Sequence, residues 1–95
     1  MHIYFACYQV RPVELESDGA GGAFLSCWVK ALSTEQAAKA CENYIAAIHW
    51  ISETVVQPAM RASSRDPHIE RAYSEGACFE LHTWPIEDTD GQSKH

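Results

Sequence analysis

An amphipathic helix with its own start signal divides this chain and limits the folds open to the rest of it. Ser33 precedes the helix and Gln36 stands three residues later, which is the spacing of a capping box that satisfies free backbone N–H groups. Residues 34–47 then carry apolar side chains three and four positions apart, the period of a helix with one buried face. That apolar stripe consists of Ala37, Cys41, Tyr44, Ile45 and Ile48.

Two segments rich in aromatic and β-branched residues precede this helix, and we expect both to be strands. Residues 3–10 end at Arg11-Pro12, and residues 24–32 follow a polar stretch that contains three glycines near its end. Such a stretch is typical of a connection between antiparallel neighbours, because glycine allows the chain to turn.

Two more strands and a second helix are predicted after the first helix. From about residue 49 the pattern approaches a period of two, and Pro58 is expected to end this strand. Asp66-Pro67 is a helix start signal, because the carboxylate can cap the first turn and the proline already has a helical φ. The inner stripe of this helix is expected to be Ile69, Ala72 and Tyr73, with Gly76 just past its end and a last strand at residues 77–85.

The resulting order, ββαβαβ, predicts a single α+β domain over residues 1–86. Each strand–helix–strand unit implies a crossover, so we expect a two-layer sandwich with both helices on one face of a mixed four-stranded sheet. This set of elements is similar to that of ferredoxin-like folds, although the order departs from βαββαβ. Residues 87–95 are polar and are expected to form a flexible tail.

Charge and cysteine content bear on partners and compartment. Seven Lys and Arg against 13 Asp and Glu give a net charge of −6, which argues against nucleic acid and anionic membranes as partners. The apolar start has no cationic leader, and no apolar stretch approaches the ~20 residues of a membrane span. The four cysteines contain no Cys-x-x-Cys pair and lie in apolar segments. We therefore expect a cytoplasmic protein with reduced thiols and no metal or other cofactor.

Alternation along the predicted strands places several aromatic residues on the sheet face that the helices are expected to leave open. A patch of Tyr and Trp is rarely left in water by a monomer, and these side chains dominate the energetics of interfaces. A homodimer is the simplest occupant, although the tail or the loop at residues 11–23 would also fit there. The expected interface residues are Tyr4, Tyr8, Trp28, Trp50 and Trp84, with Lys30, Glu80 and His82 among them.

Glu80 and His82 support a second interpretation, because they share one strand face. A carboxylate beside an imidazole can make it a better general base, so a small-molecule pocket would use His82 as the base and Glu80 to orient it. With His2 as a third ligand, the pair could also bind a metal ion, yet such alternation is typical of any half-solvated strand. The sequence thus favours a non-catalytic homodimer or other protein-interaction module, with a small-molecule-binding protein or enzyme as the alternative.

Overall fold

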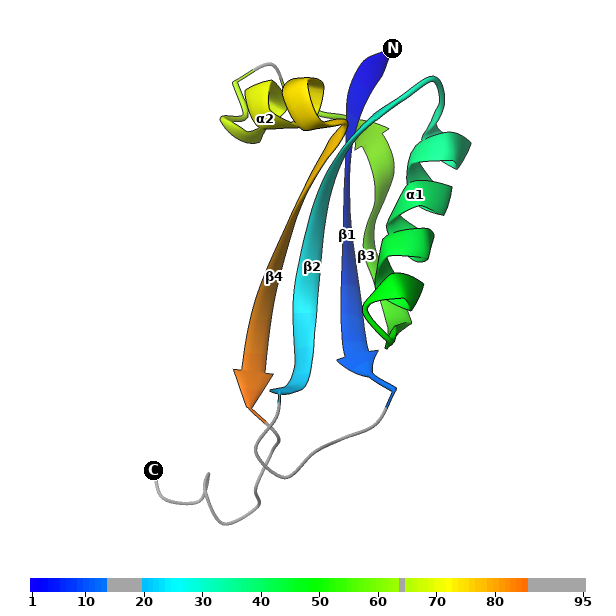
Figure 1. Ribbon diagram of the computed structural model, residues 1–95, viewed down its shortest axis with the longest axis vertical. Coiled ribbons are helices and arrows are strands. Elements are labelled where there is room, and N and C mark those ends of the chain that lie inside the picture. The colour runs from blue at the N-terminus through cyan, green and yellow to red at the C-terminus, as the bar shows by residue number, and fades with distance from the viewer. Residues whose placement is uncertain (14–19, 64, 86–95) are drawn as a thin grey trace.

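The computed structural model describes residues 1–13, 20–63 and 65–85, which form a four-stranded sheet with two helices (Figure 1). The predicted order ββαβαβ is confirmed, and the fold is α+β. Parts of the predicted connection (14–19) and the predicted tail (87–95) lie outside the described residues. The elements are β1 His2–Pro12, β2 Ala20–Ala31, α1 Thr34–Ala47, β3 Trp50–Arg61, α2 His68–Glu75 and β4 Ala77–Pro85.

All neighbouring strands of the sheet are antiparallel, so the prediction of a mixed sheet is wrong. The hairpin of β1 and β2 lies in the centre, β3 pairs with β1, and β4 pairs with β2, which gives the order β3-β1-β2-β4. β2 and β3 run in the same direction, but β1 lies between them, so the intervening helix α1 joins no parallel neighbours. This order does not clearly match a ferredoxin-like topology.

The two helices pack on opposite faces of the sheet, which corrects the expectation that they share one face. α1 runs along the length of the sheet, whereas α2 crosses one end (Figure 1). α2 connects β3 to β4, the two edges of the sheet, so its segment must pass across that end. Buried residues on the α1 face include Tyr4, Tyr8, Leu25, Cys27 and Val29, and those on the α2 face are Ile3, Trp28 and Cys78 beneath Ala72.

The predicted capping signal of α1 is confirmed, with one change of partner. The Ser33 Oγ accepts a hydrogen bond from the Gln36 backbone N–H at 3.1 Å. The Gln36 Oε1 reaches back to the backbone N–H of Leu32 at 2.7 Å instead of to that of Ser33. α1 buries Ala37, Cys41 and Ile45 against the sheet, as its apolar spacing predicted.

β3 continues through Pro58, so the prediction that this proline ends the strand is wrong. β3 lies at an edge of the sheet, where a residue without an N–H can be accommodated on the unpaired side or at a bulge. The pairing of β3 with β1 shifts register between Phe5, which is opposite Met60, and Cys7, which is opposite Gln57. Pro58 therefore falls in an irregular part of the ladder.

The second helix ends as its sequence predicts, with Gly76 in the left-handed region at φ 89° and its N–H bonded to the Ala72 carbonyl at 2.8 Å. Its inner stripe is only partly as expected. Ala72 is buried and Ile69 packs beside it, but Tyr73 is exposed, and its backbone carbonyl accepts a hydrogen bond from Lys30 Nζ at 2.9 Å.

Candidate functional site

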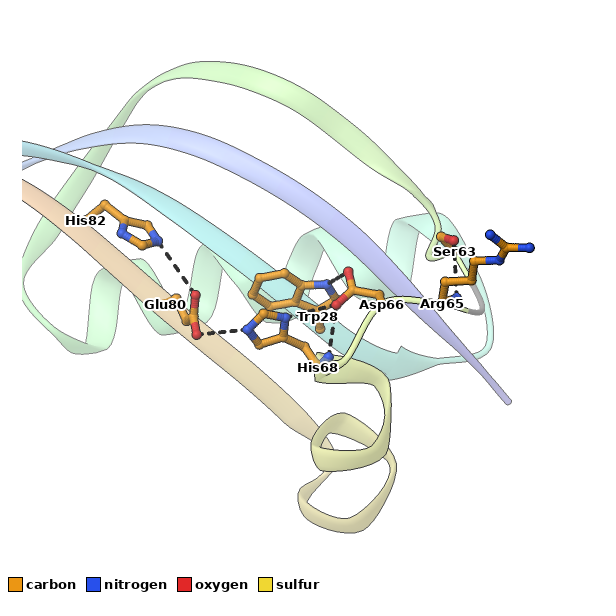
Figure 2. A network of polar contacts seen from close by, with 7 residues as sticks. All are labelled: Trp28, Ser63, Arg65, Asp66, His68, Glu80 and His82. Carbon is orange, nitrogen blue, oxygen red and sulfur yellow. Dashed lines mark hydrogen bonds and ion pairs between the residues drawn. The ribbon is translucent and has the colours of Figure 1, made fainter.

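The most connected group of polar side chains lies where α2 meets the sheet (Figure 2). The group joins the segment before α2, the first turn of α2, and the strands β2 and β4. It comprises Asp66, His68, Glu80 and His82, with Trp28 as the aromatic surface beneath.

The start of α2 fixes Asp66 in this group. One carboxylate oxygen of Asp66 accepts the backbone N–H of His68 at 2.9 Å. The predicted helix start is shifted by one residue, because α2 begins at His68 and Pro67, not Asp66, is at its N-cap position. The other oxygen accepts a hydrogen bond from the indole Nε1 of Trp28 on β2. Asp66 therefore links the start of α2 to the sheet, because one of its carboxylate oxygens binds the helix backbone and the other binds Trp28 of β2.

His68 lies between two carboxylates and an indole ring. Its Nδ1 is 2.9 Å from Asp66 Oδ1 and its Nε2 is 2.8 Å from Glu80 Oε2. Its ring stacks on that of Trp28, with centroids 3.8 Å apart and planes 15° from parallel. Figure 2 shows the imidazole between the two carboxylates, and these contacts on both ring nitrogens fix its orientation.

The two carboxylates favour the charged imidazolium. Hydrogen bonds to Asp66, and then to Glu80, raise the pKa of His68 above its usual value. Burial would raise the pKa of Asp66, but hydrogen bonds from the backbone and side chain of His68 and from Trp28 outweigh it, so that pKa is lowered. The preferred state is thus a protonated His68 that donates to both carboxylates.

An imidazole held in this way is poorly suited to general base catalysis. Both ring nitrogens of His68 already bind carboxylates, so neither is free to accept a proton from a substrate. The arrangement is instead a clamp that joins α2 to β2 and β4. We call Asp66, His68, Glu80 and Trp28 the α2 clamp.

The predicted pair of Glu80 and His82 is brought together, but it is not the main partnership of Glu80. His82 Nε2 is 3.6 Å from Glu80 Oε1, and its side chain is 66% exposed. Glu80 binds His68 more closely, and the only sequence signal for this partner is the helix start at Asp66-Pro67. The contact between Glu80 and His68 can be predicted only once α2 is known to cross the face of β4 on which Glu80 lies.

The metal-binding alternative is contradicted by the strand positions. His2 lies opposite Ala31, whereas Glu80 lies opposite Ser26, five residues farther along β2. His2 also belongs to the alternate set of β1 residues that faces α1, while Glu80 shares a face with the α2 clamp. In the described part of the chain, no three His, Cys, Asp or Glu side chains are arranged to hold a metal ion.

The five predicted interface aromatics do not form one surface. Tyr4 and Tyr8 are buried on the α1 face, because they pair with Val29 and Leu25, so their expected exposure is wrong. Trp28 is buried beneath α2 on the other face, and Trp50 packs at the rim of the α1-face core. Trp84 lies on the α2 face but beyond the α2 clamp, where its ring contacts that of Phe24 at a centroid distance of 5.2 Å.

All four cysteines lie within the described residues and each is a free thiol. Cys27, Cys41 and Cys78 are buried. Burial raises the pKa of Tyr8, and the neighbouring Cys41 thiol together with burial raises that of Cys27. Burial likewise raises the pKa of Cys78, so the thiols of Cys27 and Cys78 stay neutral and act as packing groups, because the thiolate is the reactive form.

A part of the sheet stays uncovered among the described residues. α1 packs on β1, β2 and β3 and reaches β4 through Tyr44, which stacks on Phe79 at 3.9 Å, while α2 covers the other end of β4. The remaining end exposes apolar side chains on both faces, with Leu81 36% and Phe24 43% exposed. We call this surface the open end of the sheet, formed by Phe24, Leu81, His82, Thr83 and Trp84.

Comparison of the chain with known protein families, with curated proteins and with solved structures finds no match. Neither helix within the described ranges has the length and apolar character needed to span a membrane. Any functional proposal must therefore rest on the geometry of the chain itself.

Proposed function

We propose that this chain is a non-catalytic module that forms a homodimer through the open end of its sheet. The observation that carries this proposal is the exposure of apolar side chains on both faces of the sheet at its open end, on the α1 face at Leu81 of β4 and on the α2 face at Phe24 of β2, beside Trp84. Surfaces of this kind are typical of contacts between subunits, and symmetric pairs are the commonest oligomers.

The state of His68 supports a role without catalysis. The histidine with the strongest polar contacts uses both ring nitrogens inside the α2 clamp. A small-molecule site built on His82 and Glu80 stays a prediction, and no geometry of the described residues adds to it. An open hollow beside α2 is lined by Pro67, Glu70, Arg71 and Ser74, so neither His82 nor Glu80 contributes to it.

The test compares one charged substitution at two exposed apolar positions. Leu81→Glu places a carboxylate in the open end of the sheet, and Met60→Glu places one on β3 at the opposite edge, where Met60 is 50% exposed. Light scattering over a range of concentrations should give twice 10.6 kDa for the wild type and for Met60→Glu. Leu81→Glu should give the monomer mass, because burying an unpaired charge in an interface is unfavourable.

Circular dichroism of each variant confirms that its fold is kept. A wild type that stays monomeric at every concentration would overturn the homodimer. A dimer that withstands Leu81→Glu but is dissociated by Met60→Glu would move the interface to β3.

A further inference from the structure

We propose that two copies of this chain pair through the outer edges of their β4 strands, antiparallel and centred on Leu81, so that the two sheets become one. This inference rests on the proposed homodimer and names the contact and the register that would form it. It places Leu81 of one copy opposite Leu81 of the second copy, and Glu80 opposite the second copy's His82.

β4 is the edge of the sheet that is better able to accept another strand. The sheet has two edges, β3 and β4. The pairing of β3 with β1 shifts register at three places, and β3 contains Pro58; such bulges and prolines protect an edge from pairing. β4 pairs with β2 without a shift from Trp84, opposite Gly22, to Ala77, opposite Val29. A regular strand presents an evenly spaced row of backbone groups on its outer side.

The pattern of hydrogen bonds between β4 and β2 directs the backbone N–H and C=O of Leu81 to the outer edge, where a second strand can bind them. The carbonyl of Gly76, next to β4, accepts the N–H of Lys30 on β2 at 3.0 Å. Backbone groups of successive residues in an extended strand point to opposite sides, so the odd-numbered residues of β4 direct theirs away from β2. The N–H and C=O of Leu81 therefore face the outer edge, together with those of Phe79 and Thr83.

The sequence of β4 is complementary to itself about Leu81. β4 runs from Ala77 to Pro85, so Leu81 is its central residue, and an antiparallel copy centred there pairs residues 78–84, while Pro85, which has no N–H to donate, ends the pairing. Glu80 then lies opposite the second copy's His82, so a carboxylate faces an imidazole that can donate a hydrogen bond to it on both sides of the centre. Both side chains reach solvent, at 41% and 66% exposure.

Neighbouring registers lack this complementarity. A pairing centred on Glu80 places two carboxylates directly opposite each other, and like charges so placed destabilise a strand pair. A pairing centred on His82 places the Glu80 carboxylate opposite the second copy's Trp84 and gives it no imidazole partner. Charged side chains on an edge normally discourage pairing, but around Leu81 the Glu80 carboxylate favours the register that places an imidazole opposite it instead of a second carboxylate.

The experiment is cysteine cross-linking of the full chain at positions 81 and 83 of β4, two positions whose backbone groups face the outer edge. Leu81→Cys and Thr83→Cys are each made with Cys7→Ser, since Cys7 is the one native cysteine that is not buried. The formation of the covalent dimer is followed over time in a mixture of reduced and oxidised glutathione. In the proposed register the two Cα atoms at position 81 lie about 5.5 Å apart, within reach of a disulfide. The two Cα atoms at position 83 are separated by four residues along the strands, about 13 Å, beyond its reach.

We expect Leu81→Cys to form the covalent dimer at least about tenfold faster than Thr83→Cys, because only the pair of cysteines at position 81 meets the disulfide geometry. Equal rates at the two positions, or faster cross-linking at position 83, would overturn the register. If Leu81→Glu dissociates the dimer while the two cysteines cross-link equally, the homodimer stands and the β4 pairing is refuted.

A second measurement tests the pairing of Glu80 with residue 82 of the second copy. His82→Lys places a cation opposite the second copy's Glu80, whereas His82→Glu places two carboxylates opposite each other. His82 is exposed and its removal leaves the contact between Glu80 and His68 in place. The dissociation constant of His82→Glu should be at least about tenfold that of His82→Lys, as expected for like charges in direct opposition. Equal dissociation constants would overturn the proposed pairing.

Discussion

Trp84 can lie against the sheet because its cross-strand neighbour, Gly22, has no side chain. A Cβ atom at Gly22 would lie 2.5 Å from Cζ2 and 2.9 Å from Cε2 of the Trp84 ring. Real side chains do not tolerate such distances, so the indole must move. Gly22 thus allows Trp84 to pack against Phe24.

Gly22→Ala should therefore lower the free energy of unfolding by about 1–3 kcal/mol, the usual cost of forcing extra volume into a packed site. The measurement is urea unfolding of a double-mutant cycle with Trp84→Ala. In the Trp84→Ala background the same change should cost much less, because the clash has been removed. A Cβ atom at Gly22 would also lie 3.1 Å from the backbone carbonyl oxygen of Val10. This contact is the same in both backgrounds, so its cost cancels in the cycle. Equal costs in the two backgrounds would show that the indole is not the obstacle.

Residue-scale predictions from the sequence succeeded where they depended on neighbours along the chain. Glu80 and His82 come together because alternate residues of one strand share a face. The prediction that Tyr4 and Tyr8 lie on the open face is wrong, because the aliphatic and aromatic sets of β1 are similarly apolar and the choice between them depends on pairing with β2. The packing of β1 against β2 and α1 determines which of the two sets lies on the α1 face.

At the scale of the element, α2 depends on the clamp at its start. A helix of eight residues is far below the length that is stable alone in water, so contacts with the sheet must hold it. Ala72 is its buried residue, and the α2 clamp supplies the polar contacts at its first turn. The protonation state of His68 should therefore influence how firmly α2 is held.

The sign of this dependence is set by the two pKa shifts. The pKa of His68 is raised on folding, so its contribution is complete below its unfolded value of about 6.5 and is lost as the pH rises through the folded value. The pKa of Asp66 is lowered, so its contribution is present above its unfolded value of about 3.9 and is lost as the pH falls through the folded value. The clamp should be strongest between these two unfolded values.

The free energy of unfolding from urea titrations should therefore fall between pH 6 and pH 8 in the wild type. His68→Gln should flatten this dependence, since the titrating group is gone. His82→Gln is the matched control, because His82 is exposed and lies outside the clamp, and it should keep the wild-type slope. Amide hydrogen exchange in α2 should quicken over the same range, beyond the ordinary effect of pH. A slope in His68→Gln equal to that of the wild type would contradict this role.

The sequence predicted the type and order of every element, but not their arrangement. Local signals sufficed for α1, with its cap at Ser33, and for the end of α2 at Gly76. The prediction that Pro58 ends its strand is wrong, because the effect of a proline depends on whether the strand is central or at an edge. The placement of the helices on opposite faces depends on the strand order, which no local pattern encodes.

At the scale of the whole molecule, charge opposes the association that the open end of the sheet favours. Each chain has a net charge of −6, so two copies repel each other until salt screens the field. The Debye length is about 30 Å at 0.01 M salt and about 10 Å at 0.1 M. Low salt therefore lets the charges of one whole chain act on the other, while the apolar contacts around Leu81 are little affected by these concentrations.

We therefore expect the dissociation constant of the dimer to fall as salt is raised from about 0.01 to about 0.5 M at pH 8, since screening shortens the range of the repulsion. Light scattering across a dilution series at each salt concentration measures it. Lys39→Glu on the exposed surface of α1 makes the chain more negative without touching the open end of the sheet, so it should steepen the dependence. A dissociation constant that rises with salt would show that attraction between opposite charges on the two copies outweighs the net repulsion.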